Sequence, residues 1–120
     1  MPSSLKNEQL PAPVLACCEA LLDKKAIDLT VIDVKGVSTI TDYYVIATGA
    51  SSPQLRAMAQ NAKSTLKESS EATGMIDGDP ASGWVVLDAY AFVVHLFLPD
   101  TRDQYALEAL WKDRPSVTIA

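Results

Sequence analysis

The chain has 120 residues, of which 48% are hydrophobic and 21% charged, and its fifteen acidic and ten basic residues give a formal net charge of −5. This length and composition are typical of one folded domain and exclude intrinsic disorder over most of the chain. The acidic balance disfavours a protein that captures bare nucleic acid and suits one that binds a basic partner.

The first half of the chain predicts a helix, two strands and a second helix. Apolar residues at helical spacing predict the first helix over 13–25. Runs rich in β-branched and apolar residues predict strands over 28–34 and 43–48, the second of them buried on both faces. A hydroxyl residue followed by proline begins an amphipathic helix over 51–66, and Gly74 is placed to end it.

The second half predicts a loop, a hairpin and a closing helix. Residues 77–83 are rich in turn formers and should form a loop. The apolar runs 84–87 and 92–98 lie so close in sequence that they should pair as an antiparallel hairpin. Thr101 and Gln104 have the spacing of a capping box, which predicts that a short helix begins there.

This order of elements predicts an α/β (α+β) fold. We expect a mixed β-sheet of four to five strands flanked by helices. The expected organisation is a flexible N-terminal arm over residues 1–11, a single domain over 12–114, and a tail over 115–120 that is either loose or a short edge strand. Neither a linker nor an internal repeat divides the chain.

The cysteines and the N-terminal residues indicate the compartment. Cys17 and Cys18 are adjacent, and because a disulfide between neighbours is strained, we expect two reduced thiols on a helix. The N-terminus lacks the basic start and apolar stretch of a signal peptide, and no apolar run approaches the roughly 20 residues of a membrane helix. We therefore expect a cytoplasmic protein that has no contact with membranes.

Three features could indicate catalysis, and each has a plainer explanation. His95, the only histidine, lies mid-strand, where a hydrogen-bonded packing role is more common than catalysis. Gly49 and Ser51 precede a helix whose N–H groups could hold a phosphate, but no P-loop lysine follows them. Asp77 and Asp79 have a spacing that could hold magnesium but lie in a loop. We expect no catalytic residue, no metal site and no cofactor.

The last third of the chain combines acidic and aromatic residues. It holds seven acidic and three basic residues, together with Trp84, Tyr90, Tyr105 and Trp111. Trp, Tyr and Arg are the residue types that most often anchor protein interfaces. Arg102 and Tyr105 share a face of the predicted last helix away from Leu107, which makes them better candidates for exposure than the tryptophans. For Trp111, a core position and an interface position are both open.

These residues also carry a recognisable family pattern. Three ordered blocks resemble the signature of the ribosomal silencing factor family, also called the Iojap family, and together they cover roughly residues 14–113. The first block is Asp33-Val34 with TDYYVIATGASS at 41–52, the second is GWVVLD at 83–88 with VHLF at 94–97, and the third is the spaced pattern of Arg102, Tyr105, Leu107, Glu108, Leu110 and Trp111.

The resemblance implies a mixed α/β fold that is nucleotidyltransferase-like but lacks that catalysis. It implies a non-enzymatic factor that binds the large ribosomal subunit at ribosomal protein fourteen, blocks joining of the small subunit, and represses translation when nutrients are short. Family members are often homodimers, and the expected contact with nucleic acid is small. The partner-binding positions carried over from the family pattern are Trp84, Asp88, Arg102, Tyr105 and Glu108.

One position departs from the family pattern, and two other functions stay open. The family usually has a Gly-Asp pair at the hairpin turn, where this chain has Tyr90-Ala91, so Tyr90 either adds an apolar contact or packs on its own domain. The alternative function is a nucleotide-binding or nucleotidyltransferase-like enzyme centred on Gly49, Ser51 and Asp79. A further alternative is a dimeric adaptor whose aromatic patch is its self-interface.

Overall fold

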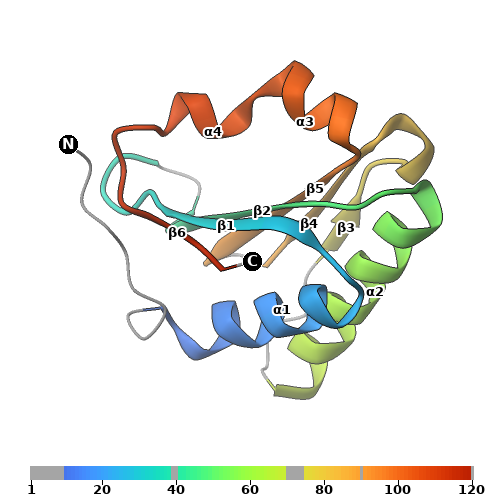
Figure 1. Cartoon of the computed structure of the whole chain (residues 1–120). Coiled ribbons are helices and arrows are strands. Elements are labelled where there is room, and N and C mark those ends of the chain that lie inside the picture. The colour runs from blue at the N-terminus through green and yellow to red at the C-terminus, as the bar shows by residue number, and fades with distance from the viewer. Residues whose placement is uncertain (1–9, 39–40, 70–74, 90, 120) are drawn as a thin grey trace.

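The computed structural model describes residues 10–38, 41–69, 75–89 and 91–119 (Figure 1). The expectations for Gly74 and Tyr90, and for most of the N-terminal arm, lie outside these residues. Leu10, the first described residue, is buried against the core. The elements in chain order are α1 (Ala12–Asp23), β1 (Ile27–Asp33), β2 (Tyr43–Thr48), α2 (Ser52–Ser69), β3 (Met75–Asp77), the 3-10 helix η2 (Pro80–Ser82), β4 (Trp84–Asp88), β5 (Phe92–Phe97), α3 (Pro99–Tyr105), α4 (Leu107–Leu110) and β6 (Ser116–Thr118).

The strands form one mixed sheet in the order β3-β4-β5-β2-β1-β6. Among the described strands, only β2 and β5 pair in parallel, and β4 and β5 form the predicted antiparallel hairpin. The α/β fold is confirmed, but the expected strand number of four to five is too low. β6 is the short edge strand that was one of the two alternatives for the tail, whereas β3 was not expected. Both are three-residue edge strands defined by backbone pairing, β6 with β1 and β3 with β4. A segment as short as β3 has too few residues for a side-chain period to reveal it.

The helices cover both faces of the sheet (Figure 1). On one face, α1 and α2 bury the larger apolar core against alternate strand residues such as Val45, Leu87 and Val94. On the other face, α3 and α4 lie over a smaller core made by Ile32, Val34, Ile46 and Phe97, with partly buried Tyr44, Trp84, Leu107 and Trp111 packed against it. Since the side chains of a strand alternate between faces, β4 and β5 contribute to both cores.

Helix α1 carries the two cysteines on its buried side. Both thiols are free, as expected, and both side chains are buried. Burial disfavours the thiolate, which raises the pKa of Cys17 and raises that of Cys18 to about 12. In the described ranges, no helix combines the length and the apolar character needed to cross a membrane.

The closing helix differs from its prediction in two ways. It begins at Pro99, with Leu98 as the N-cap residue, because the ring of proline suits the first helical turn. The capping-box prediction is therefore wrong: Thr101 lies inside the helix, and its hydroxyl lies 2.6 Å from the Gly83 carbonyl oxygen and 3.0 Å from that of Leu98. The helix is also broken at Ala106, whose φ of 46° lies in the left-handed region.

Candidate partner-binding site

Aromatic rings line the sheet face under α3 and α4. Trp84 stands opposite Phe97 in the β4–β5 register, and their ring centroids lie 5.4 Å apart. Tyr105, at the end of α3, lies over Trp84 with a centroid separation of 4.6 Å. His95 and Tyr44 continue the contacts across the sheet to Trp111. We call Tyr44, Trp84, His95, Phe97, Tyr105 and Trp111 the aromatic cluster.

His95 is the hydrogen-bonded packing residue that its position predicts. Its Nδ1 accepts a hydrogen bond of 3.1 Å from Nε1–H of Trp84, and the ring is 9% exposed. An accepting Nδ1 carries no proton, so the proton of the neutral ring is on Nε2. Burial disfavours the imidazolium and lowers the pKa of His95 to about 4. His95 is therefore neutral near pH 7 and orients the indole of Trp84.

One side of the aromatic cluster is open to solvent. Tyr105 is 49% exposed and Trp84 is partly exposed, although the two rings are in contact. Leu110 of α4, another residue on this helical layer, is 73% exposed. Two aromatic rings in tilted contact, with one side open to solvent, are the arrangement expected for an interface anchor.

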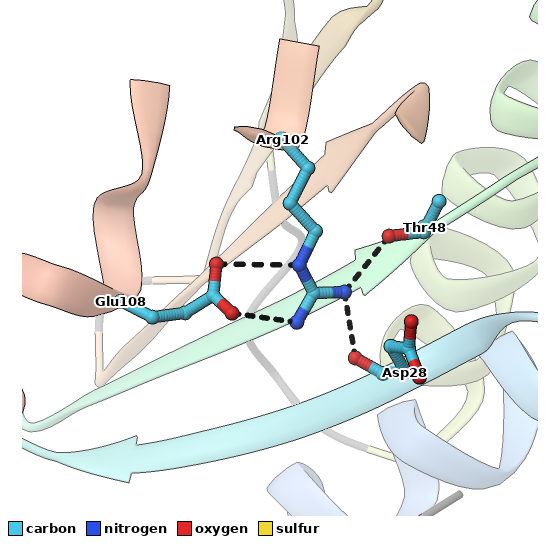
Figure 2. A network of polar contacts seen from close by, with 4 residues as sticks. All are labelled: Asp28, Thr48, Arg102 and Glu108. Carbon is cyan, nitrogen blue, oxygen red and sulfur yellow. Dashed lines mark hydrogen bonds and ion pairs between the residues drawn. The ribbon is translucent and has the colours of Figure 1, made fainter. Parts of the chain in front are cut away.

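Arg102 is the centre of a polar network beside this cluster (Figure 2). Its Nε and Nη2 donate to the two carboxylate oxygens of Glu108 at 3.2 and 3.0 Å. Its Nη1 donates to the carbonyl oxygen of Asp28 at 2.7 Å and to Oγ1 of Thr48 at 2.8 Å. The guanidinium therefore joins α3 to α4 and to the adjoining strands β1 and β2.

The expectation that Arg102 is exposed is wrong. Its side chain is only 11% exposed, whereas that of Glu108 is 39% exposed. Arg102 and Tyr105 are one turn apart on α3, as predicted, but the long arginine side chain turns inward to the strands while the ring of Tyr105 stays half exposed. The position of a residue on a helix face determines where its side chain begins. A long, flexible arginine side chain can still turn towards a different surface.

The break at Ala106 makes the Arg102–Glu108 pair possible. Residues six apart do not share a face of a continuous helix. At Ala106 the left-handed backbone costs about 1–2 kcal/mol for a residue with a Cβ, and alanine otherwise favours a continuous helix. The bidentate ion pair across the break offsets this cost, since charge-assisted hydrogen bonds are stronger than hydrogen bonds between neutral groups.

A groove of about 560 Å³ lies next to this network. Its lining includes Asp28, Asp103 and Glu108, with Arg102 as the cation. Two of these four groups, Arg102 and Glu108, neutralise each other, so the groove keeps a negative balance. A groove of this sign beside exposed aromatic rings suits a basic protein surface.

The structure brings four of the five predicted partner-binding residues together. Trp84, Arg102, Tyr105 and Glu108 lie where β4, α3 and α4 meet. Asp88 is exposed at the other end of β4, on the same strand face as Trp84 and about 13 Å along the strand. Tyr44, His95, Phe97 and Trp111 complete the cluster, and Trp111 contributes as a partly buried core residue whose Nε1 has no hydrogen-bond partner among the described residues.

The residues of the alternative nucleotide site bond to their own chain. The N–H of Ala50 donates to Oε1 of Gln54 at 2.7 Å, and Oγ of Ser51 accepts from the N–H of Gln54 at 3.3 Å. The carboxylate of Asp79 caps η2 by accepting from Ala81 N–H at 3.0 Å. In the part of the chain that the structure describes, no three His, Cys, Asp or Glu residues gather as a metal site would require.

Comparison with known proteins identifies relatives. Residues 7–120 match the family described as ribosomal silencing factor during starvation. The ribosomal silencing factor RsfS of Zymomonas mobilis is 42% identical over 93 residues, which are 78% of this chain and 70% of that protein. RsfS of Bacillus subtilis is 36% identical over 100 residues, 83% of this chain and 82% of that protein. A mouse protein, mitochondrial assembly of ribosomal large subunit protein 1, is 38% identical over 94 residues, 76% of this chain and 41% of that protein.

Solved structures share the fold. A crystal structure of a protein from Chromobacterium violaceum superposes with a TM-score of 0.79 at 29% identity, covering 97% of this chain and 94% of that one. A second crystal structure, of a protein from Bacillus halodurans, gives a TM-score of 0.74 at 32% identity, covering 88% of this chain and 96% of that one. The fold of this chain is therefore shared with these proteins.

Proposed function

This chain belongs to the ribosomal silencing factor family, and on that basis we propose that it binds the large ribosomal subunit and keeps the small subunit from joining. The proposed contact is ribosomal protein fourteen of the large subunit, and the consequence is repression of translation in the cytoplasm. The action is steric, so the proposal requires neither a catalytic residue nor a cofactor. The names of the relatives, which refer to ribosome silencing and to assembly of the ribosomal large subunit, support a role on that subunit.

The observation that carries the proposal is the exposed contact between Trp84 and Tyr105. The two rings touch at 4.6 Å, yet Tyr105 stays half exposed, so the pair is ordered before any partner arrives. Preordered aromatic anchors lose little conformational entropy on binding. Aromatic faces also attract the lysine and arginine side chains that ribosomal proteins present.

The charge beside this pair favours a protein partner over RNA. The carboxylates of Asp28 and Asp103 in the groove and the exposed carboxylate of Asp88 repel phosphates and attract a basic surface. We therefore propose little direct contact between this face and ribosomal RNA.

Co-sedimentation with purified large subunits tests the function directly. The full chain should pellet with large subunits and not with small subunits, and it should reduce the formation of complete ribosomes from mixed subunits. Gln60→Ala, an exposed change on the opposite helical layer, is the control and should behave like the wild type. A chain that pellets with neither subunit, or that binds without hindering subunit joining, would contradict the proposal.

The homodimer expected from the family is also part of the proposal. Light scattering of the full chain reports its mass, and the Tyr105→Ala variant separates two interfaces. If the variant stays dimeric but no longer binds the large subunit, the aromatic cluster is the surface that contacts the ribosome. A variant that becomes monomeric assigns the cluster to the self-interface and supports the adaptor alternative.

A further inference from the structure

Arg102 has almost no hydrogen-bond donor left for a partner. Four of the five N–H donors of a guanidinium are in use here, two of them on Glu108 and the other two on Asp28 and Thr48. The side chain is also 11% exposed. A residue bonded and buried in this way is poorly suited to contact a second protein, and a basic partner would repel its charge.

Glu108 is similarly committed. Both of its carboxylate oxygens accept hydrogen bonds from Arg102 in a bidentate arrangement (Figure 2). Its negative charge is therefore balanced by the nearest cation. A free carboxylate would attract a basic partner more strongly than this paired one does.

The pair spans the segment that carries Tyr105. Arg102 lies one turn before Tyr105, and Glu108 lies three residues after it, across the left-handed Ala106. The segment contains neither glycine nor proline at the break, so its own residues favour one continuous helix. The break therefore depends on tertiary contacts, which are the Arg102–Glu108 pair and the packing of Leu107 and Trp111 on the sheet.

We propose that Arg102 and Glu108 are positioning residues that hold the end of α3 so that Tyr105 lies against Trp84, and that neither residue touches the ribosomal partner. The effect of this pair on ribosome binding rests on the proposed function, but the placement of Tyr105 is a property of the free protein. These two residues therefore have a different role from that of Trp84 and Tyr105, which contact the partner.

The first test uses the free protein. Nuclear Overhauser effects between the rings of Tyr105 and Trp84 report their contact, and the Glu108→Gln variant keeps the size of the side chain while removing its charge. The contact should weaken in Glu108→Gln and stay unchanged in Asp103→Asn, which removes the same charge from the same groove outside the pair. Ring contacts of equal strength in all three proteins would overturn the proposal.

The second test is a double-mutant cycle measured by co-sedimentation with large subunits. Glu108→Gln should weaken binding about fivefold in the wild-type background and less than about twofold in the Tyr105→Ala background, because its effect passes through Tyr105. Asp103→Asn should change binding by the same factor in both backgrounds. An equal loss for Glu108→Gln in both backgrounds, or no loss in either, would overturn the proposal.

A rescue variant separates positioning from direct contact. Glycine adopts the left-handed region without the cost that a Cβ imposes, so Ala106→Gly should restore much of the binding that Glu108→Gln loses. A carboxylate lost from a direct contact would not be replaced by this change, so absence of rescue counts against the proposal. If the wild type itself fails to pellet with large subunits, the proposed function fails, and the ring contacts still decide the role of the pair.

Discussion

Trp84 and His95 form a hydrogen-bonded pair in which the indole is the donor and the neutral imidazole is the acceptor, with Nε1 and Nδ1 3.1 Å apart. The same indole contacts Tyr105, so the orientation of the exposed aromatic pair depends on a buried ring on the neighbouring strand. The orientation of this aromatic pair is thus linked to the protonation state of His95.

Acid should destabilise the protein through His95. Its pKa falls from 6.5 in an unfolded chain to about 4 in the fold. The unfolded chain therefore binds a proton between these values and the folded one does not, so stability is lost as pH decreases. The free energy of unfolding should fall by up to about 3 kcal/mol between pH 6.5 and 4.

Urea unfolding at pH 7, 5.5 and 4 measures this effect. The His95→Phe variant lacks the titrating group and should show a smaller decrease over the same range, although it loses the hydrogen bond to Trp84 at every pH. If the wild type and the variant show the same pH dependence, His95 is not the group responsible.

Loss of either exposed ring should weaken binding to the large subunit. Trp84→Ala or Tyr105→Ala removes half of a preordered aromatic pair and should cost about 2 kcal/mol or more, which is about 30-fold in Kd. Titration with large subunits gives the affinity, and circular dichroism verifies that each variant is folded. Folded variants with wild-type affinity would remove the aromatic cluster from the interface.

Replacing Arg102 with lysine should destabilise the fold. Lysine keeps the charge but cannot make the bidentate contact to Glu108 while also reaching Asp28 and Thr48. The expected loss is about 2 kcal/mol in the free energy of unfolding, measured with urea.

Arg114 provides the matched control for that change. It donates to the carbonyl oxygens of Asp33 and Lys35 at 3.0 and 3.3 Å and is 30% exposed. Arg114→Lys should lower the free energy of unfolding less than Arg102→Lys does, because Arg114 makes fewer hydrogen bonds and is more exposed to solvent. Equal costs for the two substitutions would mean that the Arg102 network adds no special stability.

Asp88 should act through long-range attraction rather than through a tight contact. It is exposed at the far end of β4, so Asp88→Asn should reduce affinity about threefold at low salt, as expected for a charge at the rim of an interface. The difference from wild type should shrink as salt rises, because salt screens exposed charges. A loss of affinity that is the same at low and high salt would instead indicate a direct contact.

The long periodic segments were predictable from local sequence alone. In α2, the apolar residues Leu55, Met58, Ala59 and Ala62 are all buried, as their helical spacing indicates. The continuous apolar run of β2 is buried over nearly its whole length between two helical layers. The packing role of His95 and the free thiols of α1 were likewise predictable. A histidine in the middle of an apolar strand and two adjacent cysteines on a helix each have few other structural roles.

The errors fall where contacts distant in sequence determine the outcome. Arg102 contacts Thr48 and Asp28, which lie 54 and 74 residues away along the chain, so no local spacing could indicate its burial. The break at Ala106 opposes the helical preference of its own residues. The unexpected edge strand β3 is defined by backbone pairing with β4, which the sequence of three residues does not reveal.

The sequence by itself determined the main elements, the acidic and aromatic character of the last third, and the family to which the chain belongs. Periodicity and residue type carry that information, because burial of an apolar face constrains each element separately. Only the tertiary structure decided which of the partner-binding positions carried over from the family pattern face solvent. Tyr105 and one side of Trp84 are open to solvent, whereas Arg102 is enclosed between helix and strands, because the fold brings hydrogen-bond acceptors from distant segments around its guanidinium.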